Sequence, residues 1–473
     1  MAKKLFIGRW QPGVLVILVI LSRLPFLFDG YGIDGDSWSV AITAEEIHDT
    51  GSYIASRLPG FPVHELLSSL FVRFGYFGLN LLSAVFSAMA VLYFSLVLRQ
   101  LRFRFVFLAS VTFSLVPSFY IYSTTTIDYV LAIAFIIAAL YYLLKSRMIV
   151  AGIMLGLAIG TRVTSGAMLI PFLILLFEAD GIRNNVVRMS KLAVPALLTS
   201  ILLWYPVVHE YGLEFFTYYN VPYPSIQKIL YKFSLEVWGV IGFLGIVIST
   251  GLLFLPNRIT AKKFLFPRAV NEKHVIAWLV AIDLYIIAFL KLPMESGYLI
   301  PIIPFVILLF GKYLYSKAFV FFCACLMVSA FVGNISPVER FDAANPSVAS
   351  IAFSAGGERI NLDLLKGPVI AYQERRRNGM GFVESLIEST DTLDQKTVIV
   401  AGRWYNQMIV QSDFKILKAE IRDYLSEEEA VYYYAKDFRI YYLPKQDEYN
   451  MIMRNVDLGI YGGRPYIENP FPG

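Results

Sequence analysis

The stretch Ile127–Leu144 reads IDYVLAIAFIIAALYYLL and carries one charged residue, Asp128. A helix crosses the hydrocarbon core of a bilayer with about 20 mainly apolar residues, so this stretch predicts a membrane-spanning helix. Comparable apolar runs fall at 13–28, 79–98, 105–122, 127–144, 148–160, 163–177, 191–206, 236–255, 275–290, 298–314 and 318–333. The runs at 148–160 and 163–177 are short for a crossing, which predicts tilted or partly re-entrant helices there.

The composition excludes an ordinary soluble enzyme. Hydrophobic residues make up 57% of the 473-residue chain and charged residues 16%, whereas about a quarter of the residues of a soluble domain are charged. The sequence predicts an α-helical polytopic membrane protein of about eleven transmembrane helices. We place this membrane domain at 1–334 and a C-terminal soluble α/β domain at 335–473.

Basic residues predict the orientation, because lysine and arginine gather in short cytoplasmic loops. With the N-terminus in the cytoplasm, the loops predicted inside hold about 18 basic residues, and those predicted outside hold about 6. The C-terminal domain is then extracytoplasmic, in a protein of the cell membrane. The net charge of +5 is therefore a topology signal and does not indicate a nucleic-acid partner. No small-residue cleavage site follows the first run, so we expect an uncleaved span.

Two of the regions predicted to lie outside the membrane contain predicted helices or strands. In the first outside loop, 29–78, helical stretches at 37–50 and 62–77 should lie along the membrane surface, separated by the Gly51–Pro62 linker. In the tail, apolar strands alternate with helical patterns, which predicts a small parallel sheet with crossover helices. The strands are expected at Pro368–Tyr372, Thr397–Ala401 and Phe438–Tyr442, and the helices near 378–389, 425–435 and 446–455. Acceptor docking, contact with a partner and a lid are all compatible with this tail.

The first outside loop contains the acidic string Asp34-Gly35-Asp36. This spacing lets both carboxylates reach one metal ion, or lets one take a proton while the other positions it. The same string also suits a turn whose aspartate caps the following helix, and for the string alone a turn is the more common outcome. Further acids in this loop favour chemistry: Asp29, Glu45, Glu46, Asp49 and Glu65.

Three further segments carry a family resemblance. They are Tyr53–Glu65 (YIASRLPGFPVHE), Gly156–Arg162 (GLAIGTR) and Lys291–Pro304 (KLPMESGYLIPIIP). With the acidic string, they resemble the GT-C superfamily of membrane glycosyltransferases, in particular its protein O-mannosyltransferase and aminoarabinose-transferase branch. The resemblance covers about residues 10–335 and implies a GT-C-like membrane domain.

The resemblance implies a polyprenyl-phosphate sugar donor, of which dolichyl phosphate is one form, and an acceptor protein, lipid or glycan on the outer face. Asp36, or Asp34, would be the general base, a role worth typically ~10²- to 10⁴-fold in rate. The leaving phosphate needs a cation, and Arg57, Arg162 and Lys291 are available. Each cation also has a structural alternative: Arg57 holding the loop, Arg162 capping a helix and Lys291 snorkelling.

Other polar residues could support this site. The substrate-binding or supporting candidates are Glu65, His64, Asp128, Glu295 and Tyr298. A divalent ion such as Mg²⁺, Mn²⁺ or Zn²⁺ could be held by Asp34, Asp36, His64 and Glu65, although a His-Glu pair beside an interfacial helix is more often structural.

Two other functions compete. A secondary transporter or lipid flippase is expected to carry several charges within its spans, and here Asp283 is the one clearly deep acid, at a cost of about 2.5 to 3.5 kcal/mol on insertion scales. A noncatalytic scaffold that presents the tail would leave the arginine and carboxylates of the first loop unexplained.

Overall fold

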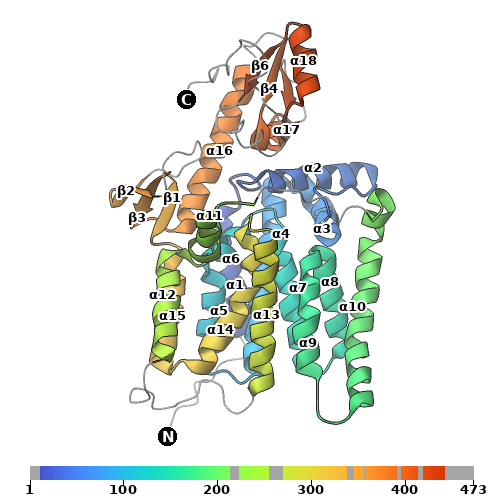
Figure 1. Ribbon diagram of the computed structural model, residues 1–473, viewed down its shortest axis with the longest axis vertical. Coiled ribbons are helices and arrows are strands. Elements are labelled where there is room, and N and C mark those ends of the chain that lie inside the picture. The colour runs from blue at the N-terminus through green and yellow to red at the C-terminus, as the bar shows by residue number, and fades with distance from the viewer. Residues whose placement is uncertain are drawn as a thin grey trace.

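The computed structural model describes residues 11–213, 223–254, 270–337, 346–355, 358–390, 396–413 and 419–442. Within these ranges the chain forms an upright helical bundle with a smaller tail at one end (Figure 1). We call the end of the bundle that carries α2 (Gly35–Thr50), α3 (Pro62–Phe71) and the tail the site end.

The bundle is built from the apolar runs of the sequence. Its α-helices are α1 Gln11–Arg23, α4 Gly75–Gln100, α5 Val106–Leu115, α6 Pro117–Tyr122, α7 Tyr129–Leu144, α8 Met148–Thr161, α9 Leu169–Leu176, α10 Ile182–Tyr211, α11 Ile226–Tyr231, α12 Val237–Leu253, α13 Glu272–Lys291, α14 Ile302–Tyr313 and α15 Ser316–Ser329. Short 3₁₀ or π turns join them at η1 Leu24–Phe26, η2 Val72–Phe74, η3 Val163–Met168, η5 Lys232–Glu236 and η6 Ser296–Leu299.

The predicted mainly helical character of this domain is confirmed. Among the described residues, four helical stretches are long and apolar enough to cross a bilayer: Pro62–Gln100, Ile182–Tyr211, Ile226–Leu253 and Glu272–Lys291. The other apolar runs fall on shorter helices. One run, 105–122, is divided into α5 and α6 at Val116, because the residue before a proline avoids the helical conformation and Pro117 follows it. The number of crossings stays a prediction.

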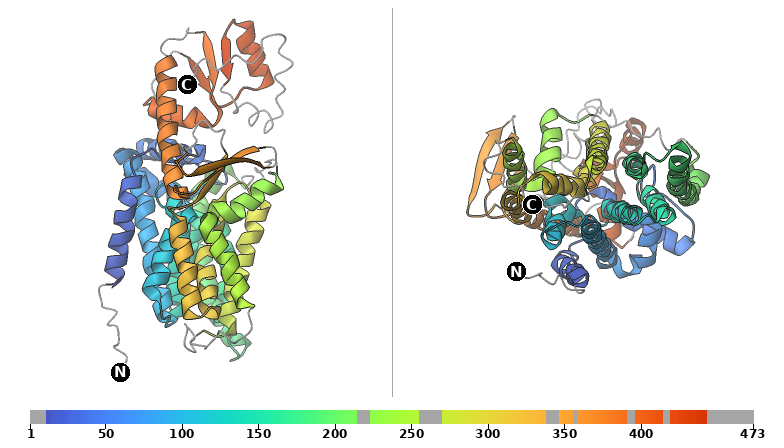
Figure 2. Two further views of the ribbon diagram at one scale, coloured as in Figure 1. Left: turned by 90° about the vertical axis from the view of Figure 1, so that its left-hand side faces the viewer. Right: turned by 90° about the horizontal axis from the view of Figure 1, so that it is seen from below.

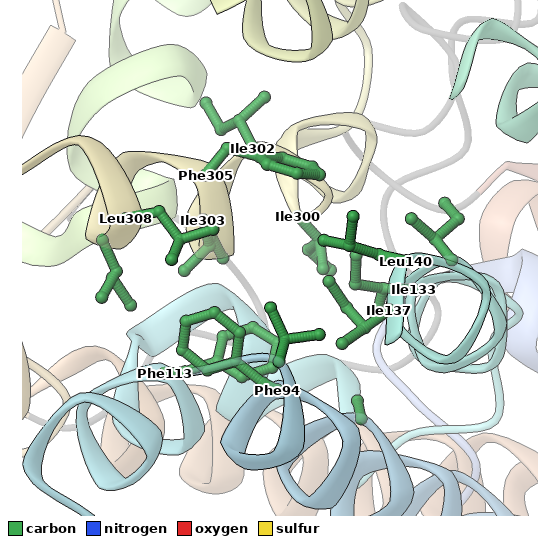
Figure 3. Close-up of a cluster of buried hydrophobic side chains, with 14 of the residues drawn as sticks. Phe94, Phe113, Ile133, Ile137, Leu140, Ile300, Ile302, Ile303, Phe305 and Leu308 are labelled. Atoms are coloured by element: carbon green, nitrogen blue, oxygen red, sulfur yellow. The ribbon is translucent and has the colours of Figure 1, made fainter. Parts of the chain in front are cut away.

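The bundle is centred on α7, which is buried on all sides from Val130 to Leu140. A helix that is apolar all round belongs inside a bundle, as the sequence of this run requires. Figure 3 shows Ile133 and Ile137 of α7 facing Phe94 of α4 and Phe113 of α5, with residues 300–308 closing the cluster.

Close helix packing depends on small residues in α8. Gly152, Gly156 and Gly160 recur every four residues, and an added Cβ at each would lie within 2.6 Å of an atom of α10. This small-residue spacing lets two membrane helices approach closely.

The site end is crossed by two helices of the first loop, α2 Gly35–Thr50 and α3 Pro62–Phe71, and α2 lies across the top of the bundle in Figure 1. The predicted helical stretches at 37–50 and 62–77 are therefore confirmed, the second divided among α3, η2 and the start of α4. Gly51 ends α2 in the left-handed conformation (φ 70°), which favours glycine.

In the part of the tail that the structure describes, the strands form two small sheets. The first is antiparallel, in the order β1-β3-β2, with β1 Asn334–Pro337, β2 Ser350–Ala355 and β3 Glu358–Asp363; Ile335 and Ile351 both face Leu362 in register. The second is parallel, in the order β5-β4-β6, with β4 Thr397–Val400, β5 Glu420–Arg422 and β6 Arg439–Tyr442. Its helices are α16 Pro368–Thr390, α17 Tyr405–Gln411 and α18 Glu427–Ala435, with the 3₁₀ turn η7 Gly402–Trp404.

One tail prediction is wrong. The apolar segment Pro368–Tyr372 begins α16 and is not a strand. A proline suits the first turn of a helix, and Val369 packs against Tyr120 and Ala330 of the bundle, so tertiary burial decides the conformation. Strands at Thr397–Ala401 and Phe438–Tyr442 are confirmed to within a residue, and the helix near 425–435 is confirmed to within two residues. The predicted helix at 446–455 lies outside the described residues.

Helix α16 joins the tail to the bundle (Figure 2, left). Arg376 of α16 is 2% exposed. It donates hydrogen bonds to four main-chain carbonyls of the bundle: those of Phe26 (3.0 Å), Asp29 (3.1 Å), Gly30 (2.5 Å) and Thr124 (3.1 Å). These carbonyls lie just before Asp34 and Asp128 in the chain, so one tail residue ties together two segments of the site end.

Replacing Arg376 with Ala should loosen the tail from the bundle. Each buried carbonyl left without its donor costs about 1–3 kcal/mol, so limited proteolysis of the detergent-solubilised protein should cut the tail markedly faster. Arg377→Ala is the matched control, because Arg377 is 63% exposed and pairs with Asp29 at the surface, a contact worth about 0–1 kcal/mol. Equal cleavage rates for both variants would contradict this role of Arg376.

Candidate active site

The acidic pair lies at the start of α2 in the site end. Asp34 occupies the N-cap position of α2, but its side chain makes no capping hydrogen bond. Helix capping therefore does not explain why a carboxylate stands at this position. Asp36, in the first turn, has a side chain 47% exposed. Burial raises the pKa of the Asp34 carboxyl, and the nearby Asp36 carboxylate raises it further against the opposing charge of Lys232.

A line of alternating charges connects Asp36 to the bundle. Arg57 Nε lies 3.0 Å from Asp36 Oδ2, and Arg57 Nη2 lies 3.1 Å from Asp128 Oδ1. The other oxygen of Asp128 lies 2.5 Å from Arg162 Nη1. Asp128 and Arg162 are 1% and 7% exposed, and buried charges must be paired. Four of the predicted site residues therefore form one network.

Aromatic rings hold the two guanidinium groups. The Arg57 guanidinium carbon lies 4.1 Å from the ring centroid of Phe61, and that of Arg162 lies 4.1 Å from Tyr129 and 4.7 Å from Tyr298. Such contacts stabilise a cation over a ring face. Tyr298 therefore contacts this network through Arg162, and its supporting role stays a prediction.

Two buried nitrogens in this region have no hydrogen-bond partner among the described residues. They are Arg57 Nη1 and His64 Nδ1. A buried N–H without a partner is costly, and a guanidinium donor binds anionic oxygens most strongly. Arg57 Nη1 is therefore a buried donor whose hydrogen-bonding capacity is unused, and an anion that entered beside Asp36 would satisfy it.

Glu65 shapes the loop that carries Arg57. Its two carboxylate oxygens accept hydrogen bonds from Tyr53 Oη (2.5 Å), Ser56 N (2.8 Å), Ser56 Oγ (2.6 Å) and Phe61 N (3.0 Å). The carboxylate is fully buried, and all four donors belong to the segment 53–61. Glu65 thus has a supporting role, and its oxygens face the loop.

Replacing Glu65 with Gln should unfold this loop locally, since an amide cannot accept from all four donors. We expect a lower midpoint of thermal unfolding and faster proteolytic cleavage within 51–61. Glu46→Gln removes an exposed acid of α2 and serves as the control; surface changes of this kind usually stay within about 0.5 kcal/mol. Unchanged protection of the loop in Glu65→Gln would contradict the role of Glu65.

A second ionic cluster lies beside the first. Lys232 Nζ is 3.6 Å from Glu236 Oε1 and 3.9 Å from Glu295 Oε2. Ser296 Oγ donates to Glu236 (2.9 Å), and Tyr122 Oη donates to Glu295 (3.4 Å). Lys232 and Glu236 are the two ends of the π-helical turn η5, a rare conformation that often marks functional sites.

The sequence pointed to Lys291 as a third cation, but its side chain is exposed at the end of α13 and forms no ion pair with a described residue. Lys232 lies closer to the acids, with its Nζ 3.9 Å from Glu295 Oε2 and in charge interaction with Asp34. One signal could have revealed it: Lys232 and Glu236 are four residues apart at the start of an otherwise apolar run.

Glu295 should give stability a distinctive pH dependence. Burial raises its pKa to about 8, with Lys232 opposing the shift and Asp34 and Glu236 adding to it. Between its ordinary value of 4.5 and 8 the folded state keeps a proton that the unfolded state has lost, so the free energy of unfolding falls as pH rises through this window. Glu295→Gln should remove that component from thermal unfolding followed between about pH 5 and 9. Parallel profiles for wild type and Glu295→Gln, with Glu272→Gln as control, would contradict it.

The predicted metal ligands are not brought together. Across the described ranges, no group of three or more His, Cys, Asp or Glu side chains is arranged to hold a metal ion. Glu65 directs both oxygens to its own loop, and Asp36 is paired with Arg57. These residues do not fit a divalent ion, and no step below uses one.

No family model and no curated protein sequence matches the chain, but solved structures do. ArnT from Cupriavidus metallidurans in the apo state matches with 16% identity over 66% of this chain and 59% of that chain, at a TM-score of 0.44. Its complex with undecaprenyl phosphate matches with 16% identity over 67% and 60%, at 0.43. An Archaeoglobus fulgidus oligosaccharyltransferase tethered to an acceptor peptide matches with 12% identity over 88% and 64%, at 0.46.

These solved structures are members of the GT-C superfamily, the superfamily that the sequence segments resemble. The chain spans about three fifths of the length of the structures that it matches. At identities of 16% and below and TM-scores under 0.5, the similarity says nothing about activity, which must be judged from the side chains of the site.

Proposed function

We propose that this protein is a GT-C-type glycosyltransferase that moves a sugar from a polyprenyl-phosphate donor to an acceptor on the extracytoplasmic face. The acceptor class, protein, lipid or glycan, is left open. The observation that carries the proposal is the placement of Arg57. It joins a half-exposed carboxylate, Asp36, to the buried Asp128–Arg162 pair, and its Nη1 has no hydrogen-bond partner among the described residues.

In this proposal Arg57 binds the donor phosphate. The open Nη1 offers a charged hydrogen bond to a phosphate oxygen, and Asp128 fixes the guanidinium through Nη2. Arg162 in turn holds Asp128 and is itself enclosed by aromatic rings. Donors held in place before the reaction stabilise developing charge with little reorganisation, and such stabilisation supplies much of the rate enhancement of many enzymes.

Asp36 is the proposed general base. The acceptor oxygen attacks the anomeric carbon as its proton passes to Asp36, and the bond between that carbon and the phosphate oxygen breaks. The phosphate leaves with the bonding electrons, and Arg57 meets its negative charge. Asp34 is the second candidate, because its raised pKa makes it a stronger proton acceptor.

The proposed topology follows from the charge pattern. Eleven crossings, with the N-terminus in the cytoplasm, put the site end on the extracytoplasmic face, where α16 of the tail borders the acidic pair. In this arrangement membrane lipids surround the bundle, and the polyprenyl chain of the donor lies in the bilayer.

A transporter or lipid flippase should place its ionisable groups at mid-membrane. Here the ion-paired residues lie at helix ends: Asp128 immediately precedes α7 and Arg162 immediately follows α8. This placement favours chemistry at the membrane surface over transport through the bundle.

The test uses the purified full chain in liposomes, with polyprenyl phosphates carrying radiolabelled sugars of several kinds and a membrane extract that supplies acceptor proteins, lipids and glycans. We expect at least one sugar to be cleaved in a protein-dependent manner, with free polyprenyl phosphate formed in equal amount. Movement of intact labelled lipid between the leaflets, without cleavage of any donor, would overturn the proposal and favour a flippase.

A further inference from the structure

Asp283 is a carboxylate on an otherwise apolar helix face. It is the twelfth of the twenty residues of α13, so about 12 Å of helix separate it from Lys291 and about 16 Å from Glu272. That depth places it near the middle of a bilayer about 30 Å thick.

The side chain does not point into the bundle. Asp283 is exposed, as are Ile276, Leu279, Ile287 and Leu290. Their spacing of three to four residues puts them on one stripe of α13. The opposite face packs against α9 and α14, and α13 stands in the foreground of the bundle in Figure 1. Asp283 forms no hydrogen bond or ion pair with the described residues, and Asp283 takes no part in the proposed reaction.

A lone carboxylate facing hydrocarbon is expensive, and acids within membrane spans almost always have a partner. The partner must reach mid-membrane, so it is itself a transmembrane helix. Its chemistry follows from the charge: a lysine or arginine at the same depth would neutralise Asp283 with a charge-assisted hydrogen bond. A second copy of α13 would instead bring another carboxylate to the same place, and like charges repel.

We infer that the stripe Ile276, Leu279, Asp283, Ile287 and Leu290 docks a transmembrane helix of another protein that carries a lysine or arginine at mid-span. The partner helix would lie against α13, whose C-terminal end at Lys291 leads into the loop that carries Glu295. This inference does not depend on the proposed glycosyltransferase activity.

The test uses the full chain in liposomes and two fluorescent synthetic helices of leucine and alanine, one with a central lysine and one with a central leucine. The lysine helix should bind the wild type about tenfold more tightly than the leucine helix, measured by energy transfer, and Asp283→Leu should abolish the difference. Combining Asp283→Leu with Ile287→Asp moves the acid by one turn and should restore binding to a helix whose lysine is moved by one turn.

Asp283→Leu should leave the rest of the protein intact, which its unchanged thermal unfolding would verify. Equal binding of both helices to the wild type would overturn the inference. So would a wild-type dimer that Asp283→Leu dissociates, because the stripe would then serve a second copy.

Discussion

Replacing Asp36 with Asn should lower the rate of sugar transfer by about 10²- to 10⁴-fold, the usual contribution of a general base. The amide keeps the size of the side chain and can no longer take the proton of the acceptor. Binding of the donor should change little, because Arg57 keeps its contact with Asp128. Initial rates with a saturating radiolabelled donor, compared with the binding constant for polyprenyl phosphate, separate the two effects.

The matched control is Asp49→Asn, which removes an acid from the other end of the same helix. Asp49 pairs with Arg73 at the surface, so Asp49→Asn should have no effect on transfer.

The Asp34→Asn variant distinguishes the two candidate bases. If Asp36 is the base, Asp34→Asn retains the larger part of the rate. Full activity of Asp36→Asn with near-complete loss in Asp34→Asn would move the role to Asp34, and full activity of both would exclude base catalysis by this pair.

Replacing Arg57 with Gln should weaken donor binding and slow the chemical step, with a combined loss in kcat/KM of about 10²- to 10³-fold. The variant loses the charge that meets the leaving phosphate and the open donor Nη1. Arg57→Lys should recover only part of the activity, because an ammonium group cannot bridge Asp36 and Asp128 while offering a third donor in fixed geometry. Steady-state kinetics and binding of polyprenyl phosphate without sugar measure the two losses separately.

Arg73→Gln is the control for Arg57, since it removes a cation of the same loop region whose partners, Glu45 and Asp49, lie away from the site. An Arg57→Gln variant with wild-type affinity for polyprenyl phosphate would contradict the assignment of Arg57 to the phosphate.

The sequence was a good guide to the bundle because a bilayer imposes one simple requirement, about 20 apolar residues for each crossing. The apolar runs fall on helical segments, although 105–122 is divided into α5 and α6 and 163–177 into η3 and α9. It was a poorer guide to the tail. Pro368–Tyr372 is apolar and short, which suits a buried strand, and only the bundle residues that Val369 contacts make it the first turn of a helix.

The sequence predicted the individual residues of the site, but it did not predict the hydrogen bonds and ion pairs that connect them. Nothing in the sequence shows that Asp128 is bonded to two arginines that lie 71 positions before it and 34 positions after it. The sequence analysis chose Lys291 over Lys232 for the same reason. Both lysines are predicted near the same membrane surface, and only the folded structure shows that Lys232 lies beside Glu295. Likewise, Glu65 looked like a metal ligand because the hydrogen bonds of its loop are invisible in the sequence.

The most direct test of the central claim is an experimental structure of the full chain with a polyprenyl phosphate bound. We expect the phosphate within hydrogen-bond distance of Arg57 Nη1, with its chain in the bilayer and Asp36 beside the position of the sugar. A phosphate bound elsewhere, with Arg57 still joined to Asp36 and Asp128 and its Nη1 still without a partner, would contradict the account.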